Sequence, residues 1–356
     1  MPGPLMNAPE SPPLRLTQLS HGGGCGCKIA PGVLRRILGE VDRTRVPAAL
    51  LVGLETADDA AVYQLNDRQA IVATTDFFMP IVDNPFDFGA IAATNALSDV
   101  YAMGATPLFA LAIVGMPIDT LPIDVIRKIL EGGEAVCARA GIPVAGGHTI
   151  DAPEPIYGLV AIGVVDPRHV KRNAAARAGD VIVLGKPLGV GIYSAALKRE
   201  ALSPADYAVL LATTTRLNTA GRALGGMESV HALTDVTGFG LLGHLLEMCR
   251  GAGLGATLDM VRVPLLPAVL ALAANGYVTG ASRRNFESYA EDVIFAASIG
   301  TGERALLSDP QTSGGLLVAC AADAQDAVLD VFRRDGLADA AVIGSFVDGA
   351  PRIVVA

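Results

Sequence analysis

Strand-type and helix-type patterns alternate along most of this chain, and this alternation restricts its fold more than any other feature. Apolar runs typical of strands and segments with helical spacing follow one another in the first half, with strands over 70–75, 108–114 and 157–165 and helices over 88–103 and 123–140. A similar alternation begins again near residue 180. Each half has about 150 residues, an ordinary domain size. We therefore expect a two-domain α/β protein with mixed sheets.

Further elements are expected at the start of the chain and in its second half. Helical patterns cover 30–38, 192–198, 204–224, 241–251 and 322–334. Strand patterns cover 48–53, 180–185, 256–261, 315–319 and 341–346. No Rossmann or Walker A glycine motif is present in the sequence, so a nucleotide would have to bind by another arrangement.

The charge balance and the hydropathy pattern exclude several classes of partner. The chain has 27 Lys and Arg against 36 Asp and Glu, a net charge of −9, so it has no overall attraction for nucleic acid or an anionic membrane. Two uncharged runs, 100–118 and 263–282, are long enough to span a bilayer, but Gly and Pro residues interrupt both. The N-terminus lacks the basic start and apolar core of a signal peptide. We expect a cytoplasmic protein that binds neither nucleic acid nor membrane.

The segment from His21 to Lys28, HGGGCGCK, is the most unusual local sequence. Its glycines allow a backbone that approaches a ligand closely, and Lys28 is expected to lower the pKa of the nearby thiols. A mobile loop with a reactive Cys25 is one interpretation. Half of a zinc site and a disordered Gly-rich tail are the alternatives. The other three cysteines, Cys137, Cys249 and Cys320, are expected to be small buried apolar residues.

Five aspartates recur at positions where strands or helices are expected to end or pack: Asp58, Asp59, Asp76, Asp99 and Asp235. Each alone is an ordinary turn or surface residue. Asp99 shares a helix face with Asn95, and burial there would require a partner for its charge. Carboxylates together with phosphate oxygens are the ligands that Mg²⁺ prefers. The set therefore favours a metal–nucleotide enzyme.

A glycine-rich segment, Gly146 to Asp151, adds a phosphate-binding candidate. Backbone amides of Gly146 and Gly147 can form an anion-binding turn, and Thr149 can donate to phosphate. His148 would by default be a structural hydrogen-bonding residue.

Together, these segments resemble the selenophosphate synthetase (selenide, water dikinase) family over residues 15 to 350. The matching motifs are HGGGCGCK at 21–28, DDAAV at 58–62, TTDFFMPIVDNPFDFG at 74–89, ATNALSD at 93–99, GGHTIDAPEPIYG at 146–158, TDVTGFGLLGH at 234–244 and DPQTSGGLL at 309–317.

The resemblance implies a fold, a reaction and a site. The implied fold is the two-domain aminoimidazole ribonucleotide synthetase-like (PurM-like) fold, dimeric through the N-terminal halves. The implied boundaries are a flexible segment at 1–50, an ATP- and metal-binding domain at 51–167 and a C-terminal domain at 168–356. The implied reaction converts ATP, selenide and water into selenophosphate, AMP and phosphate with Mg²⁺. A selenium-delivery protein is left open as a partner.

By the same resemblance, Cys25 and Lys28 occupy the catalytic positions and Asp59, Asp99 and Asp235 the metal positions. The implied ATP contacts are Lys28, Thr56, Ala57, Asp58, Asp76, Asp99, Gly147, His148 and Thr149. Ala57 stands where similar proteins often have a larger, basic side chain, so a contact there would come from the backbone.

Two other functions remain open at this stage. A thiamine-monophosphate kinase or the purine-pathway synthetase would share the acidic segments but would not require the Cys25–Lys28 loop. A thiol redox or selenium-carrier protein would require the loop but not five aspartates. Selenide-dependent formation of AMP separates all three.

Overall fold

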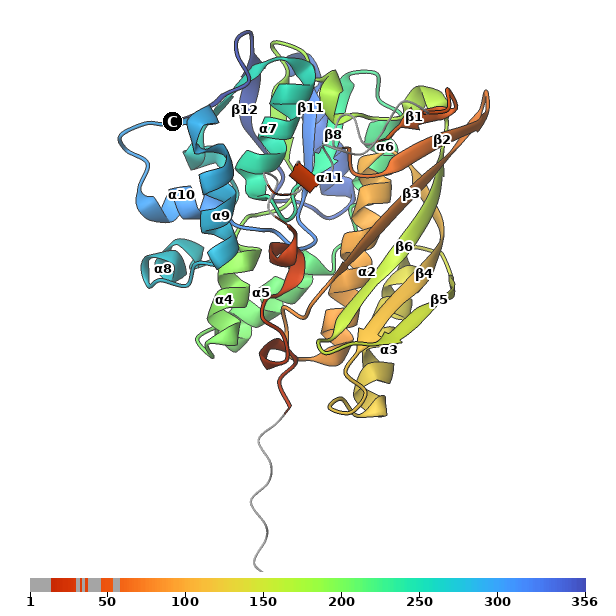
Figure 1. Cartoon of the computed structure of the whole chain (residues 1–356). Coiled ribbons are helices and arrows are strands. Elements are labelled where there is room, and N and C mark those ends of the chain that lie inside the picture. Colours follow the sequence, from red (N-terminus) through yellow and green to blue (C-terminus); the bar gives the residue numbers. More distant parts are fainter. Residues whose placement is uncertain (1–13, 30–32, 34–35, 38–45, 54–57) are drawn as a thin grey trace, which may run out of the picture.

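The N-terminal half forms a six-stranded sheet in the computed structural model, which describes residues 14–29, 33, 36–37, 46–53 and 58–356 (Figure 1). The strand order is β1-β2-β3-β6-β4-β5. The strands are β1 (Leu50–Val52), β2 (Ala61–Asn66), β3 (Gln69–Phe78), β4 (Thr106–Met116), β5 (Val144–Asp151) and β6 (Ile156–Val165). Neighbouring strands are antiparallel except β4 and β5, which are parallel.

Helices α2 (Pro85–Ala102) and α3 (Ile123–Arg139) cover one face of this sheet. Helix α2 begins with Asn84, whose side chain accepts a hydrogen bond from the Asp87 amide, and with a proline at its first position, which is a strong start signal. The helix is buried from Phe88 to Ala102 because it also packs against the second half of the chain. A Cβ atom at Gly89 would collide with the Ile129 carbonyl oxygen, so this glycine lets α2 and α3 approach closely.

The second half forms a seven-stranded sheet with the order β10-β13-β9-β12-β7-β11-β8. Its strands are β7 (Val181–Leu184), β8 (Val230–Asp235), β9 (Gly255–Leu258), β10 (Val293–Phe295), β11 (Leu316–Cys320), β12 (Ala341–Val347) and β13 (Ile353–Val355). Its helices are α4 (Val190–Lys198), α5 (Pro204–Thr214), α6 (Ala220–Gly225), α7 (Gly240–Ala252), α8 (Val269–Ala274), α9 (Gly280–Tyr289), α10 (Thr301–Leu307) and α11 (Gln325–Arg334). Short 3₁₀ turns are η1 (Leu16–Gln18), η2 (Gly24–Cys27), η3 (Pro167–His169), η4 (Asn173–Ala175), η5 (Met260–Arg262), η6 (Ala290–Asp292) and η7 (Ala322–Ala324).

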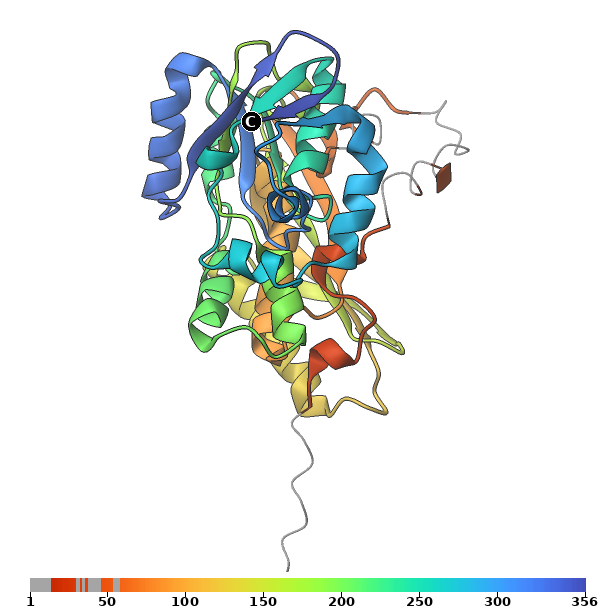
Figure 2. The ribbon, with the colours of Figure 1, turned by 90° about the vertical axis from the view of Figure 1, so that its left-hand side faces the viewer.

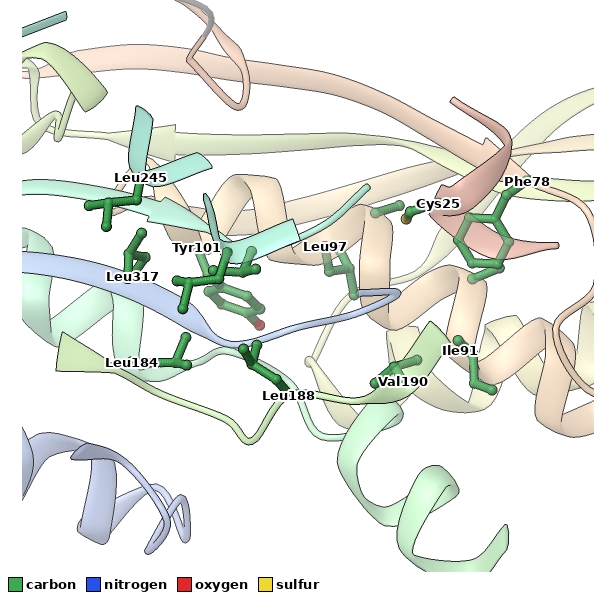
Figure 3. Packing of buried hydrophobic residues seen from close by; sticks show 14 of the residues in the cluster. Cys25, Phe78, Ile91, Leu97, Tyr101, Leu184, Leu188, Val190, Leu245 and Leu317 are labelled. Atoms are coloured by element: carbon green, nitrogen blue, oxygen red, sulfur yellow. The ribbon is translucent and has the colours of Figure 1, made fainter. Parts of the chain in front are cut away.

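One connected cluster of buried apolar side chains joins the two halves (Figure 3). Leu97 and Tyr101 of α2 belong to it, together with Leu184 and Leu317 of the second sheet. The N-terminal turn η2 also belongs to the cluster through Cys25, and both views place this turn beside α9 (Figures 1 and 2). The core therefore holds both sheets and the cysteine loop in one arrangement.

Most expected elements match, but residues 204–224 are not one helix. They form α5 and α6, separated by residues 215–219. The Asn218 side chain in this gap donates to Ser98 Oγ and to the Gly314 carbonyl, and these tertiary contacts replace the continuous helix. Strands β2, β5 and β8 are not predicted by the apolar patterns used above. The helix expected over 30–38 lies largely outside the described residues.

The remaining expectations on burial can be compared directly. Cys137, Cys249 and Cys320 are each at most 1% exposed, which confirms that they are buried apolar residues. Among the described residues, no helix combines the length and the apolar composition that crossing a bilayer requires.

Candidate active site

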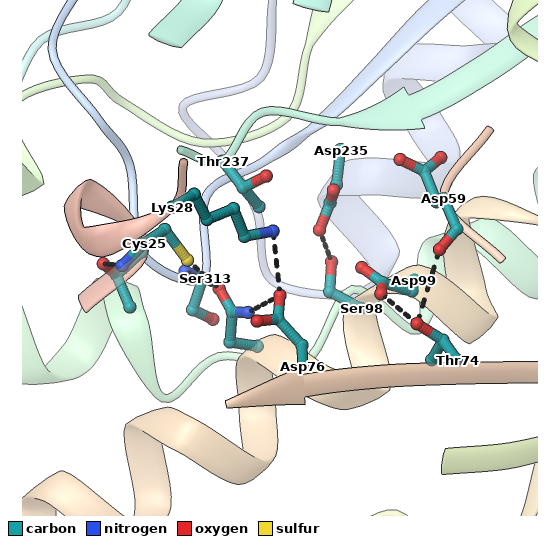
Figure 4. A network of polar contacts seen from close by, with 12 residues as sticks. Cys25, Lys28, Asp59, Thr74, Asp76, Ser98, Asp99, Asp235, Thr237 and Ser313 are labelled. Carbon is teal, nitrogen blue, oxygen red and sulfur yellow. Dashed lines mark hydrogen bonds and ion pairs between the residues drawn. The ribbon is translucent and has the colours of Figure 1, made fainter. Parts of the chain in front are cut away.

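Four aspartates from four segments of the chain meet where the two halves join (Figure 4). Asp59 precedes β2, Asp76 lies on β3, Asp99 lies on α2 and Asp235 ends β8. Asp76, Asp99 and Asp235 are at most 8% exposed. Burial of several carboxylates in one place is costly unless hydrogen bonds or cations offset their charges.

Hydroxyl groups supply part of that compensation. Thr74 Oγ1 donates to Asp99 Oδ2 at 2.5 Å, and the Ser98 hydroxyl donates to Asp235. Thr234 Oγ1 donates to Asp59 Oδ1 at 2.8 Å, which links β8 to the segment before β2.

The remaining electrostatic cost raises the pKa values of three carboxyl groups. Burial raises the pKa of Asp59 and of Asp99 well above the usual range, and repulsion from Asp235 adds to both shifts. Burial likewise raises the pKa of Asp235, against the opposing effect of the hydrogen bond from Ser98. Three carboxylates that repel one another while buried are an arrangement that a bound cation would stabilise.

A test for a divalent cation can be made on the donor atoms. Asp59 Oδ2 is buried and has no hydrogen-bond partner among the described residues, so one carboxylate oxygen is unused. All the donors are hard oxygens, as Mg²⁺ requires. In the described part of the chain, no three His, Cys, Asp or Glu side chains converge closely enough to enclose a metal on their own. The residues fit a Mg²⁺ ion that takes its remaining ligands from phosphate and water.

The cysteine loop is docked against this cluster. The Gly24 amide donates to the Met79 carbonyl at 2.8 Å, and the Cys25 amide donates to Thr312 Oγ1 at 3.1 Å. Gly24 has φ +55°, and a Cβ atom there would collide with Thr312 and Ile81. Glycine is therefore needed at this position for the docked conformation.

Asn95 connects the loop to the carboxylates. Its Oδ1 accepts from Cys25 Sγ at 3.2 Å and from the Ser313 amide at 2.6 Å, while its Nδ2 donates to Asp76 Oδ2 at 2.7 Å (Figure 4). The side chain is fully buried and uses both ends of its amide.

The thiol prediction is wrong for Cys25 in its net direction. Burial raises the pKa of Cys25 well above the usual range and Asp76 adds to the rise, whereas Lys28 and the hydrogen bond with Thr312 lower it only in part. Burial also raises the pKa of Cys27 to about 11. Both groups are neutral thiols at neutral pH in the docked loop, because desolvation outweighs the nearby cation.

Lys28, which follows η2, extends its side chain from the cysteine loop to the carboxylate cluster. Its Nζ lies 3.2 Å from Asp76 Oδ2. Desolvation by the surrounding side chains acts to lower the pKa of Lys28, whose side chain is still 39% exposed, but attraction by Asp76 and by Asp99 and Asp235 outweighs it and raises the pKa. The ammonium group therefore stays charged.

The structure does not bring every sequence-predicted site residue together. Gly147, His148 and Thr149 lie on the edge strand β5, with β6 and β4 between them and β3. Three strand spacings amount to roughly 14 Å. These residues instead line a separate cavity of about 280 Å³ between β5 and α3. Asp58 accepts a hydrogen bond from the Asn173 amide at 2.7 Å, and Thr56 and Ala57 lie outside the described residues.

Several polar residues of the site were not predicted as site residues. They are Thr74, Asn95, Ser98, Thr312 and Ser313. The spacing of Asn95 and Asp99 on an otherwise apolar helix is a signal in the sequence, but alone it is equally typical of a surface contact. Thr312 and Ser313 follow Asp309 in a segment that alone indicates only a turn.

Comparison with protein families identifies both halves. Residues 57–165 match the family described as AIR synthase related protein, N-terminal domain, and residues 177–356 match the corresponding C-terminal domain. Similar solved structures include a thiamine-monophosphate kinase from Stenotrophomonas maltophilia K279a, with 23% identity, a TM-score of 0.62 and coverage of 91% of this chain and 94% of that one. A HypE–HypF complex gives a TM-score of 0.67 at 18% identity, covering 92% and 96%. These likenesses confirm the expected PurM-like fold.

Curated relatives are much more similar in sequence. A protein from Burkholderia pseudomallei (strain K96243) named selenide, water dikinase is 66% identical over 96% of both chains. Proteins of the same name from Pseudomonas straminea and Rhizobium meliloti (strain 1021) are 64% and 55% identical, each over 96% of this chain and over 96% and 98% of their own length. This chain therefore belongs to the selenide, water dikinase family.

Proposed function

We propose that the chain makes selenophosphate from selenide, ATP and water and releases AMP and orthophosphate. For the atoms of this reaction to balance, ATP must lose two phosphoryl groups, one transferred to selenium and one to water. Family membership makes the chain a phosphotransferase. The observation that carries the reaction is the docking of a loop with Cys25 and Lys28 directly over buried carboxylates.

Asp59, Asp99 and Asp235 are the residues that would hold Mg²⁺. The ion, when bound, would neutralise phosphate charge and polarise the transferred phosphoryl group. The three carboxylates come from both halves of the chain, so their spacing depends on the way the two sheets pack together.

Lys28 supplies a fixed cation to phosphate oxygens or to the selenide anion, because its pKa keeps it charged. Asp76 orients this ammonium group at 3.2 Å. Cys25, which is 1% exposed, is held by Asn95 in a space from which the docked loop excludes water. Exclusion of water protects a reactive selenium anion and strengthens the electrostatic contacts.

The nucleotide would lie along the carboxylate cluster, near Asp58, Asp76, Asp99 and Lys28, with Thr56 and Ala57 next to them in sequence. Residues 147–149 are too distant in the same subunit to complete this site. A second subunit could supply them.

A homodimer formed through the N-terminal sheet would let the second subunit supply residues 147–149. The face of the sheet opposite α2 and α3 exposes large apolar side chains on four strands: Tyr63, Phe77, Leu108 and Ile150, each between 43% and 58% exposed. Adjacent apolar side chains on an otherwise open sheet are typical of an interface. A selenium-delivery protein would be a further partner.

An anaerobic assay tests the reaction. Phosphorus NMR follows AMP, orthophosphate and selenophosphate in the presence and absence of selenide, with Mg²⁺ and ATP. We expect AMP and selenophosphate only with selenide. Formation of ADP with thiamine monophosphate would instead indicate the kinase of the same fold, and selenium binding without ATP consumption would indicate a carrier.

A further inference from the structure

A second cavity borders the cysteine loop on the side away from the carboxylates. It has a volume of about 320 Å³ and is lined by the loop, the residues that follow β3, the whole length of α4 to Lys198 and Arg199, and the N-terminal part of α9. Gly26 of η2 lines it, while Cys25 on the same turn faces Asn95. Figure 1 shows η2 lying between α9 and β3, and the turn contacts both elements.

The charged side chains that line this cavity are basic. They are His21, Lys198, Arg199 and Arg284, and no Asp or Glu is among the lining residues. This is unusual in a chain with a net charge of −9. His21 is paired with Glu154 at 2.9 Å, so it contributes little free charge.

The other three cations have no acidic partner within ion-pair distance in the described part of the chain. Lys198 Nζ donates to the Ser20 carbonyl at 3.0 Å, and Arg199 Nη1 to the Gly276 carbonyl at 3.2 Å. Arg284 Nη2 makes only a long contact of 3.4 Å with the Gly26 carbonyl. Each cation keeps further donors for an anion.

The N-terminus of α4 does not account for the positive charge here. The first amides of α4, at Gly189 and Val190, donate to Gln311 Oε1, and the Ile192 amide donates to Asp309. Asp309 is buried behind Gly191, and burial raises its pKa to about 7. The three side chains therefore supply the charge of the cavity.

We infer that this cavity binds a phosphate-class dianion, orthophosphate or selenophosphate, on its way out of the active site. The role as a product site rests on the proposed function. The cavity offers no carboxylate for a metal, and its volume is at the lower end for ligand pockets, so it suits a small free anion better than a magnesium nucleotide. Two guanidinium groups and an ammonium group match the oxygens of such an anion.

Arg284 gives this site a connection to the loop. Arg284 contacts the Gly26 carbonyl, which belongs to the turn that carries Cys25, so an anion bound by the remaining donors of Arg284 lies beside the docked loop.

The test is a calorimetric titration of the full chain with orthophosphate or thiophosphate at low ionic strength, without ATP or selenide. Thiophosphate stands in for selenophosphate. The variants are Arg284→Met and Lys198→Met. The matched control is Arg283→Met, which changes the preceding residue of α9, an exposed arginine paired with Glu287 outside the cavity. We expect about tenfold weaker anion binding in each cavity variant, the usual effect of losing one charged hydrogen bond, and no change in the control.

Affinity for magnesium-ATP, measured on the same samples, should be equal in all four proteins, which also checks that the variants are folded. Equal anion affinity in wild type and cavity variants would overturn the inference, as would displacement of the anion by AMP. Tighter binding of thiophosphate assigns the cavity to selenophosphate, and tighter binding of orthophosphate assigns it to the second product. Because the titration needs no turnover, it can succeed or fail independently of selenophosphate synthesis.

Discussion

Cys25 Sγ donates a hydrogen bond to Asn95 Oδ1 at 3.2 Å, across 70 positions of sequence. This contact joins the glycine-rich cysteine loop to α2, which is buried along most of its length. The other end of the same amide holds Asp76, which pairs with Lys28. The thiol and the ammonium group of the loop are thus positioned by one side chain and its acidic neighbour.

Asn95→Leu should disrupt this positioning while preserving side-chain volume. The variant leaves the thiol, the Ser313 amide and Asp76 without their shared partner, so the loop should undock more often. We expect selenophosphate formation to fall at least about tenfold and alkylation of Cys25 by iodoacetamide to accelerate. Thr94→Ala is the control, because its hydroxyl donates to the Ala90 carbonyl of its own helix and, among the described residues, makes no hydrogen bond with the loop. Unchanged alkylation in Asn95→Leu would show that Asn95 does not hold the loop.

Cys25→Ser and Cys27→Ser should have different consequences although only Gly26 separates the two residues in the loop. Cys25 faces Asn95 and the carboxylates, whereas Cys27 is only half-buried and has no hydrogen bond to that cluster among the described contacts. We expect Cys25→Ser to lose selenide-dependent synthesis and to keep magnesium-ATP affinity, measured by calorimetry. Cys27→Ser should keep most of its activity. The reverse ranking would show that the wrong thiol has been assigned.

Asp59→Asn and Asp235→Asn should each weaken the response to Mg²⁺. Each removes one negative charge from the buried cluster, and amides are poorer Mg²⁺ ligands than carboxylates. We expect the Mg²⁺ concentration for half-maximal activity to rise at least about tenfold, with thermal unfolding of the metal-free protein not lowered, because a repulsive charge is lost. Asp124→Asn, on the exposed start of α3, is the control. Wild-type activity at limiting Mg²⁺ in either variant would contradict the metal assignment.

Lys28→Ala and Lys28→Arg test whether charge alone is sufficient. Removal of the ammonium group should lower turnover by about 10²–10³-fold, the usual effect of deleting a donor to developing charge. Arginine keeps the charge but presents a planar fork in place of a compact ammonium group, so little activity should return in the space beside Asp76. Steady-state rates of AMP formation give the comparison, and native turnover in Lys28→Arg would refute a specific geometric role.

The sequence predicts this molecule well where local pattern and tertiary packing agree. Helix α2 is an example, because Asn84 and Pro85 mark its start and its apolar content marks its burial. Prediction from the sequence fails where tertiary contacts override the local pattern. Asn218 is an example, because its side chain bonds Ser98 and Gly314 and the expected helix over 204–224 is interrupted there. The sign of the Cys25 pKa shift also depends on burial, which a neighbouring lysine in the sequence does not reveal. Residues 147–149 belong to one of the motifs that indicate the site, but their strand β5 lies three strand spacings from β3, and only the strand order shows this separation.

The raised pKa of Cys25 predicts a specific pH dependence of loop docking. Below the ordinary thiol pKa of about 8.5, Cys25 is protonated in both the docked and the released loop, so docking does not depend on pH. Above that value the released loop gains stability by ionising, while the docked thiol stays neutral because burial raises its pKa, so docking weakens as pH rises. Alkylation of Cys25, followed by mass spectrometry between pH 7 and about 10.5, should therefore show a midpoint above that of a free thiol. In Asn95→Leu the midpoint should shift down towards the ordinary value, because the released loop is then more populated. A Cys25 midpoint at or below about 8.5 in the wild-type protein would mean that the loop is not docked in solution as it is in this structure.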